Sequence, residues 1–355
     1  MLVTQSEVLK SALRWRKGAW LCFGALALCV LSLFPYLTSS TELVRLRNAL
    51  VLIEERGHGF EWTPATVPLD FMLERGPADP LFVDAAQKLG LAKMSSDWER
   101  AMAISRHLLS NPKLVGTPIQ SNLRDTYRRI LEDGTGYCGD FTRVFMAFAL
   151  AAGIPVRAWA FSFDGFGGYG HIWPEIWNRQ LNRWQLVDVF NNFYFHGEDG
   201  VAISALEFRQ AMLTAPNSIR RSLLHTGARP GYEIEEKMWA WYRKGLPEWY
   251  MAWGNNVFSY DRALMVRNLG RFSRSLEQAQ AIYLDVHPKV SLLVNNENRT
   301  RSDALWRVRL HLMIAAWGAF ILTVALVVCL VFWRVALGRN RVVESRHAVG
   351  GENAS

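Results

Sequence analysis

Three side chains in the middle of the chain, Cys138, His171 and Asp188, could together perform nucleophilic catalysis. A cysteine thiolate attacks a carbonyl carbon, and a histidine takes up and returns the proton. An aspartate fixes the tautomer of the histidine ring and stabilises its charged form. The loop glycines Gly134 and Gly136 precede Cys138, which is therefore placed at a helix start. Unpaired N–H groups and the helix dipole favour an anion there, so this position favours the thiolate.

The segments after Cys138 predict one helix followed by antiparallel strands. The predicted helix covers 139–152, and the predicted strands cover 156–163, 171–177 and 183–190. Alternation with period two puts His171, Trp173 and Glu175 on one face of their strand, and it places Asp188 on the neighbouring strand. A glycine-rich loop at 165–170 lacks the residues of a phosphate-binding loop, and we expect it to approach or gate a cleft.

Each of these residues also has a purely structural interpretation. Cys138 could be a buried core thiol, because free cysteine is among the most buried residue types. His171 could be an ordinary strand histidine, and Asp188 a turn carboxylate. Against this, Cys138 is the only cysteine between two long apolar runs, and Asp188 lies in an apolar strand where an unpaired charge is costly. Asp140 and Glu175 are expected to cap the helix and to assist the histidine, respectively.

Three blocks of sequence resemble the transglutaminase-like superfamily, a papain-related cysteine fold. They are GYCGDFTRVFMAFALAAGIPVR, HIWPEIW and WQLVDV, and they occur in order at compatible spacing within about residues 95–192. The resemblance implies an α+β fold in which the helix carrying the cysteine packs on an antiparallel sheet. It also implies roles: Cys138 as nucleophile, His171 as general base and acid, and Asp188 as the residue that orients His171.

The chain departs from the family pattern in modest ways. Pro174 lies inside the histidine strand, which predicts an edge strand or a bulge. No upstream side chain can be identified as an oxyanion-hole donor, so the Cys138 backbone N–H is the expected one. Animal transglutaminases use calcium, but no run of alternating acidic ligands occurs here. We therefore expect no metal and no cofactor.

Two uncharged apolar runs, 19–37 and 312–333, predict two transmembrane helices. Basic tails flank them at 1–18 and 334–355. The positive-inside bias then places both termini in the cytoplasm, and 38–311 in the periplasm if the membrane is a bacterial inner membrane. A cleaved signal peptide is the alternative for the first run. The tails carry +3 and +2 of the net charge of +8, so the composition does not call for a nucleic-acid partner.

The extracytoplasmic region is predicted to have three parts. They are a lead-in segment, a transglutaminase-like domain and a helical Trp-rich extension, over 38–94, 95–200 and 201–311. The aromatic residues of the extension are expected to pack in a core or to contact the membrane surface. Stacking against sugar rings is the alternative.

The sequence thus predicts a membrane-anchored cysteine enzyme that acts on amide bonds of a protein or peptide through a thioester. Hydrolysis and acyl transfer share that intermediate, so the sequence does not separate them. A protein of another class fits as well. It would be a scaffold or binding protein of an envelope or exopolysaccharide assembly, with its chemistry unused.

Overall fold

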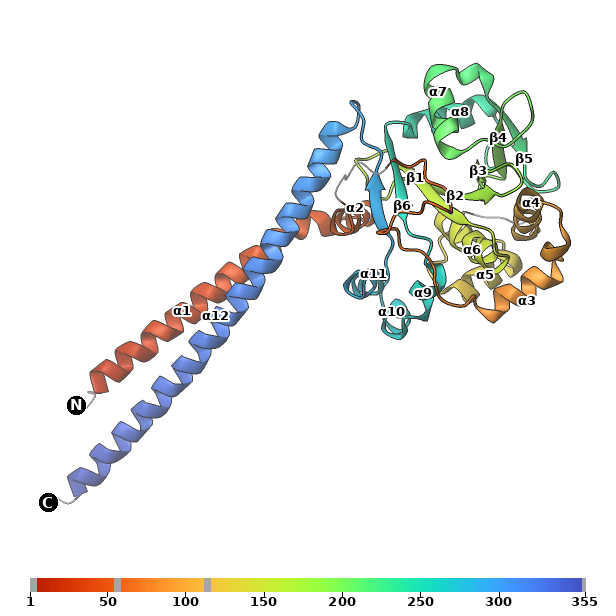
Figure 1. Ribbon diagram of the computed structural model, residues 1–355. Coiled ribbons are helices and arrows are strands. Elements are labelled where there is room, and N and C mark those ends of the chain that lie inside the picture. The colour runs from red at the N-terminus through yellow and green to blue at the C-terminus, as the bar shows by residue number, and fades with distance from the viewer. Residues whose placement is uncertain (1–4, 54–58, 112–115, 353–355) are drawn as a thin grey trace. The chain divides into compact units, whose positions relative to one another are not determined.

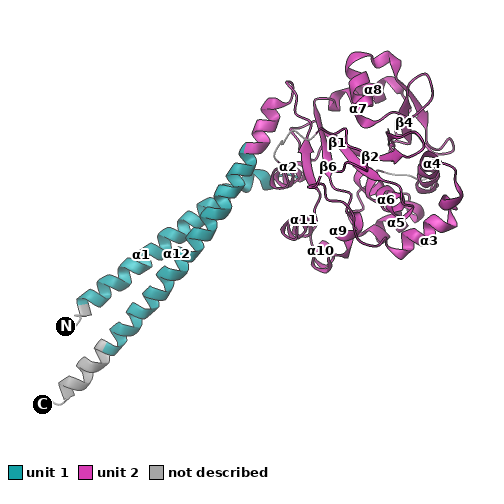
Figure 2. Cartoon of the chain, in the orientation of Figure 1, with its two compact units in different colours: residues 1–39, 307–355 teal, residues 40–306 magenta. Residues whose placement is uncertain are grey.

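The computed structural model describes residues 5–53, 59–111 and 116–352. The chain divides into two compact units, coloured separately in Figure 2. Unit 1 combines Met1–Ser39 with Arg307–Ser355, and unit 2 is Ser40–Trp306.

Unit 1 is a pair of long helices, α1 (Gln5–Leu31) and the greater part of α12 (Arg299–Glu352), which lie side by side (Figure 1). Trp15 of α1 stacks on Phe332 of α12 with ring centroids 4.8 Å apart. Many other apolar side chains of both helices are exposed. Exposed apolar surface of this extent is typical of a surface that contacts a membrane or another protein.

The prediction of two transmembrane helices is corrected to one. In the described part of the chain, only Arg299–Val342 is long and apolar enough, by length and composition, to cross a membrane. The first predicted span, 19–37, is interrupted, because α1 ends at Leu31 and a separate 3₁₀ helix covers Phe34–Leu37. The uncharged part of α1, 19–31, rises only about 20 Å, whereas a hydrocarbon core is about 30 Å thick. The topology with both termini in the cytoplasm rested on two spans and loses that support.

Unit 2 is built on one five-stranded sheet with every neighbouring pair antiparallel (Figure 1). Its order is β3-β2-β1-β6-β7, with bounds Arg183–Leu186, Gly170–Asn178, Val156–Ser162, Glu248–Trp253 and Lys289–Leu292. The register pairs Phe161 of β1 with His171 of β2. The expected α+β class with an antiparallel sheet is confirmed.

One face of the sheet is covered by helix α6 (Cys138–Ala151), which carries the cysteine. Four more helices contribute to the same core: α3 (Pro80–Lys88), α4 (Asp97–Leu108), α5 (Leu123–Glu132) and α9 (Val257–Arg262). Phe141, Phe145 and Phe148 of α6 are fully buried. Burying each such ring is worth about 2–3 kcal/mol, so this core fixes where α6 begins.

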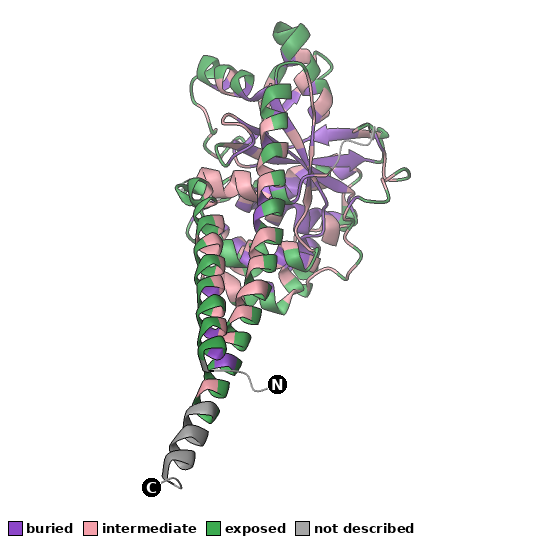
Figure 3. Ribbon diagram, turned by 90° about the vertical axis from the view of Figure 1, so that its left-hand side faces the viewer, coloured by how far each residue is buried: buried purple, intermediate pink, exposed green. Residues whose placement is uncertain are grey.

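The opposite face is aromatic. Trp159, Trp173, Trp249 and Trp253 are essentially inaccessible there. Helices α7 (Ala205–Thr214) and α8 (Glu235–Gly245) contribute to this core, as does the ribbon of β4 (Phe193–His196) and β5 (Arg220–Leu223). In Figure 3 the buried residues concentrate in the sheet and in the helices packed against it.

The prediction that 201–311 is helical is wrong for three segments, β5, β6 and β7. In β6, Trp249, Met251 and Trp253 are fully buried while the residues between them are partly exposed, which is the period of a strand. Because β6 pairs with β1, the sheet continues across residue 200. Helices α2 (Ser40–Leu50), α10 (Leu264–Gly270) and α11 (Arg274–Tyr283) complete the unit, with short 3₁₀ turns at Leu91–Lys93 and Pro216–Ser218.

The expectation for Pro174 is also corrected, because β2 is a central strand between β1 and β3. The Pro174 carbonyl accepts a hydrogen bond from the Val187 N–H at 3.0 Å. The missing N–H of Pro174 therefore faces the β3 side, where the β2–β3 ladder starts only at Glu175. A proline at the end of a ladder leaves the strand intact.

Candidate active site

Cys138 is the first residue of α6, as the sequence predicts, and it is partly exposed. The Asp140 carboxylate caps this helix start by accepting the N–H of Tyr137 at 2.9 Å and the N–H of Ile119 at 3.1 Å. Asp140 is thus the expected capping acid. Through Ile119, Asp140 also connects the segment before α5 to the start of α6. The thiol of Cys138 lies at the positive end of the helix dipole.

A glycine sets the turn that leads into α6. Gly136 has φ of +139°, a conformation that side-chain-bearing residues rarely adopt. A Cβ atom on Gly136 would lie 2.9 Å from the ring of Phe141. This glycine therefore lets the chain turn closely over the helix start that carries Cys138.

His171 is the second residue of β2 and is buried. Its Nε2 lies 2.8 Å from Oδ2 of Asp188. The ring also packs between Trp173 and Trp241, with centroid separations of 5.0 and 4.9 Å. Because Nε2 is directed at Asp188, Nδ1 is the nitrogen left to face the thiol.

The surroundings of the His171 ring raise its pKa. Burial lowers it, but the charge of Asp188 and the hydrogen bonds to Asp188 and Cys138 raise it to about 10. The thiol of Cys138 is thus one of the groups that act on the His171 ring, and both residues line one cavity. The ring is protonated at neutral pH, whereas an unperturbed histidine titrates near about 6.5. An imidazolium beside a sulfur stabilises the thiolate.

Asp188 lies beyond β3 rather than inside a longer strand, so the predicted strand over 183–190 is too long. Its backbone forms an isolated bridge with Phe193, with N–O distances of 2.9 and 3.0 Å. The bridge closes a tight turn that directs the buried carboxylate at His171. The structure thus brings all three predicted residues together.

Two further residues hold this carboxylate, and the sequence reasoning missed both. Asn191 donates its backbone N–H to Oδ1 at 3.2 Å and its Nδ2 to Oδ2 at 3.0 Å. The hydroxyl of Tyr242 on α8 also donates to Oδ2. Burial, and then the charge of Asp188, raise the pKa of Tyr242 well above 10, so it remains a donor. The spacing of Asn191 from Asp188 suits a turn, but no local signal places Tyr242, which is distant in sequence.

Glu175 does not serve His171 as expected. Its carboxylate accepts from Arg157 Nε at 2.6 Å, from Trp159 Nε1 at 3.0 Å and from the Ala205 N–H at 2.6 Å. Burial opposes the charge of Arg157 and lowers its pKa, while Glu175 counters that effect. This ion pair ties the sheet to the start of α7.

Cys138 and His171 line one cavity of about 530 Å³ within unit 2. Glycines of the 165–170 loop form part of its wall, and Gly168 donates its N–H to Thr41 Oγ1 of α2 at 2.8 Å. Gln120 also lines the cavity, and its backbone N–H lies 3.4 Å from Asp140.

Across residues 5–53, 59–111 and 116–352, no group of three His, Cys, Asp or Glu side chains is arranged to hold a metal ion. The donors present are those of covalent acyl chemistry: a thiol, an imidazole and an orienting carboxylate.

Comparison with known proteins identifies a domain in this region. Residues 84–189 match the family model of the transglutaminase-like superfamily, which includes cysteine enzymes acting on amide bonds. The match contains Cys138, His171 and Asp188. No curated protein matches the chain.

Two solved structures show distant similarity, each at 13% identity. Rad4–Rad23 bound to a 6-4 photoproduct UV lesion gives a TM-score of 0.23, covering 84% of this chain and 59% of that chain. Rad4–Rad23 crosslinked to an undamaged DNA gives 0.21, with 83% and 59% covered. The chain thus spans about three fifths of the length of those chains, and similarity at these scores supports no functional argument.

Proposed function

We propose that the protein is a cysteine enzyme that cleaves or transfers amide bonds through a thioester, with Cys138, His171 and Asp188 as its catalytic residues. The observation that carries the proposal is the buried His171 ring, which is bonded to Asp188 through Nε2 and lines the same cavity as Cys138. A thiol placed only for packing has no need of a charged imidazole partner.

In the first half of the reaction, the Cys138 thiolate attacks the amide carbonyl carbon. The tetrahedral intermediate collapses, the C–N bond breaks, and His171 donates its proton to the departing nitrogen. In the second half, His171 takes a proton from water or from an acceptor amine as it attacks the thioester. The C–S bond then breaks, which restores the thiolate and releases an acid or a new amide. Asp188 keeps the imidazole oriented and stabilises its charged form throughout.

The negative oxygen of the tetrahedral intermediate needs donors beside Cys138. The N–H of Cys138 is at the first position of α6 and has no acceptor within the helix, so it supports this role. Gln120 lines the same cavity, and we propose its carboxamide as the second donor.

Helix α12 supports a membrane anchor for this enzyme. The run 312–333 is uncharged, and Arg334, Arg339 and Arg341 follow it. Arg301, Arg307 and Arg309 lie equally close to its other end, so the positive-inside bias does not fix the orientation of the helix. We propose a peptide or protein substrate of the cell envelope.

The proposal is tested with iodoacetamide on the full chain in detergent, with labelling read at Cys138 by peptide mass spectrometry. We expect rapid labelling at neutral pH in the wild type and a loss of about 100-fold in His171→Ala. Labelling of Cys138 at the rate of a free thiol, or labelling indifferent to His171→Ala, contradicts an activated thiolate. Full rescue of a deletion strain by Cys138→Ala favours the scaffold instead.

A further inference from the structure

The cavity that holds Cys138 has an excess of positive charge. Among the described residues that line it, the permanent cations are Arg47, Arg143, Arg274 and Lys289, and the only carboxylate is Asp140. That carboxylate already accepts backbone N–H groups at the start of α6. The charges of the cavity therefore do not balance among its own lining residues.

Arg47 of α2 is the least compensated of these cations. Its Nε and Nη2 donate to Oδ1 of Asn48, at 3.3 and 2.9 Å, and no carboxylate pairs with it among the described residues. Asn48 is fixed in this orientation because its Nδ2 donates to the Phe166 carbonyl at 2.8 Å. A neutral amide oxygen satisfies the geometry of the guanidinium but not its charge.

Two of the other cations have carboxylate partners that do not line the cavity, since Arg274 pairs with Glu277 and Lys289 lies 3.9 Å from Asp285. Arg143 lies 3.9 Å from Asp261, and its buried Nη2 has no hydrogen-bond partner in the described part of the chain. A buried donor without a partner is costly, and an anion in the cavity would satisfy it.

Neighbouring groups respond to this positive field. Burial, followed by the charge of Arg47 and then those of Arg274 and Arg143, lowers the pKa of His287 to about 3. Burial also lowers the pKa of Arg47, and the charge of Arg274 lowers it further. An anion bound between Arg47 and Arg274 would relieve their mutual repulsion.

Arg47 and Cys138 both act on a third residue of the cavity, Tyr250. Burial raises the pKa of Tyr250, and the charges of both Arg47 and Cys138 act on it. Tyr250 lines the cavity with them. A ligand that contacts Arg47 can therefore extend to the thiol within a cavity of about 530 Å³, a size typical of small-ligand and peptide sites.

We infer that this cavity selects acidic peptide substrates, with a carboxylate bound by Arg47 and Arg274 while the amide carbonyl lies at Cys138. The inference rests on the proposed function and adds a substrate class to it. Arginine is the suitable residue, because its planar fork binds a carboxylate through two parallel hydrogen bonds.

The test uses acetylated tripeptide vinyl sulfones, which alkylate an active-site thiol, with the full chain in non-ionic detergent. Matched probes carry one Glu or one Gln, moved through the three positions. We expect the Glu probe to react about tenfold faster than its Gln partner at one position, with a preference that falls at high salt. In Arg47→Gln the ratio of the two rates should fall toward one, and Arg47→Lys should keep part of it.

Arg128→Gln is the matched control, because Arg128 on α5 is 57% exposed and pairs only with Asp125 and Glu132 at 3.6 and 3.5 Å. It should leave the Glu-to-Gln ratio unchanged. If the Glu and Gln probes react with the wild type at equal rates at all three positions, the inference is overturned. This outcome does not depend on the folding of any variant. A Glu-over-Gln rate preference that persists in both Arg47→Gln and Arg274→Gln also overturns the inference. The same conclusion follows if anionic lipid vesicles protect Cys138 equally from the Glu and the Gln probe. If neither probe reacts with Cys138, the proposed function fails instead.

Discussion

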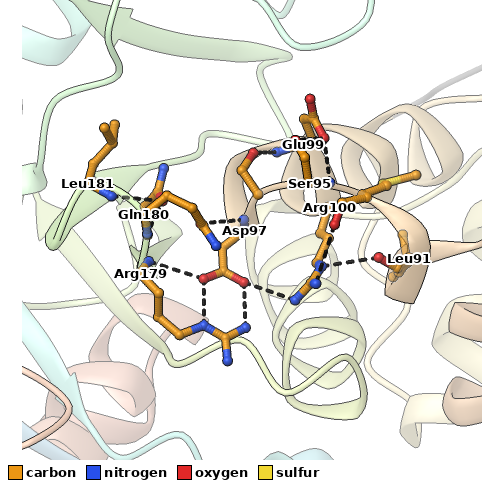
Figure 4. A network of polar contacts seen from close by, with 11 residues as sticks. Leu91, Ser95, Asp97, Glu99, Arg100, Arg179, Gln180 and Leu181 are labelled. Atoms are coloured by element: carbon orange, nitrogen blue, oxygen red, sulfur yellow. Dashed lines mark hydrogen bonds and ion pairs between the residues drawn. The ribbon is translucent and has the colours of Figure 1, made fainter.

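Two buried carboxylates in unit 2, Asp97 and Asp188, are held in contrasting ways. Asp97 begins α4 and binds Arg179 through Nε at 2.7 Å and Nη2 at 2.6 Å, as Figure 4 shows. It also accepts from Arg100 at 3.1 Å. Among the described residues, Asp188 has no arginine partner and is held by a histidine, a tyrosine and an asparagine.

The difference teaches which buried acid can take part in chemistry. The guanidinium of arginine does not release its proton in proteins, so Asp97 is permanently paired. Burial opposes its charge, but the bonds to Arg179 dominate and lower its pKa. Its effect is structural, since it joins α4 to the turn between β2 and β3. The imidazole beside Asp188 can release its proton, so the same kind of carboxylate there can support proton transfer.

Replacing the carboxylate beside His171 should have the largest effect on reactivity. In Asp188→Asn the ring loses its counter-charge, so its pKa should fall from about 10 to below the usual value of about 6.5. The ring is then neutral at pH 7, and iodoacetamide labelling of Cys138 should slow by about 10²- to 10⁴-fold. NMR titration of the ring and peptide mass spectrometry measure the two changes.

The pH dependence of the unfolding free energy provides a second test of Asp188→Asn. A raised pKa in the folded state means that the His171–Asp188 interaction stabilises fully below about pH 6.5 and is lost as pH rises through about 10. Wild-type unfolding free energy should decline over that window, and the decline should vanish in Asp188→Asn. An unchanged His171 titration in the variant would contradict the assigned pairing.

Replacing Asp97, the carboxylate bound by arginine, should lower stability and leave the reactivity of Cys138 nearly unchanged. Asp97→Asn should lower the unfolding free energy by about 2–3 kcal/mol, because charge-assisted hydrogen bonds are weakened while half-exposed Arg179 can rehydrate. Because the pKa of Asp97 is lowered on folding, its stabilisation is present above about pH 4 and is lost as pH falls through the folded pKa. Denaturant unfolding at pH 7 and pH 3 measures both effects. Labelling of Cys138 should stay within about twofold, and a large loss would show that the two regions are coupled.

Removing one donor from Asp188 should have the smallest effect. Tyr242→Phe deletes a single hydroxyl while Asn191 and His171 remain, so we expect about 1–2 kcal/mol of destabilisation and up to tenfold slower labelling of Cys138. Tyr127→Phe is the matched control, because its hydroxyl bonds His107 Nε2 at 2.8 Å away from the site. It should lose comparable stability without slower labelling. Equal labelling in both variants would show that Tyr242 only supports packing.

Much of the α6 region could be predicted because its determinants are local. Gly136 allows the turn, Asp140 caps the helix, and apolar spacing buries Phe141 and Phe145. The strands around His171 could also be predicted, because the alternation of side chains between the two faces of a strand is visible within a few residues. The predicted membrane span over 19–37 was wrong because a hydropathy average takes no account of helix ends, and α1 ends at Leu31.

The sequence by itself determined the identity of the three candidate catalytic residues and the elements that carry them, because short-range spacing encodes turns, caps and strand faces. Only the tertiary structure decided that β6 and β7 extend the sheet, that Tyr242 reaches Asp188, and that Arg47 faces the cavity of Cys138. Those contacts join residues 36 to 94 positions apart, from Trp253 and Lys289 to Ala158 and Ala252. They depend on how whole elements pack, which no local pattern of side chains records.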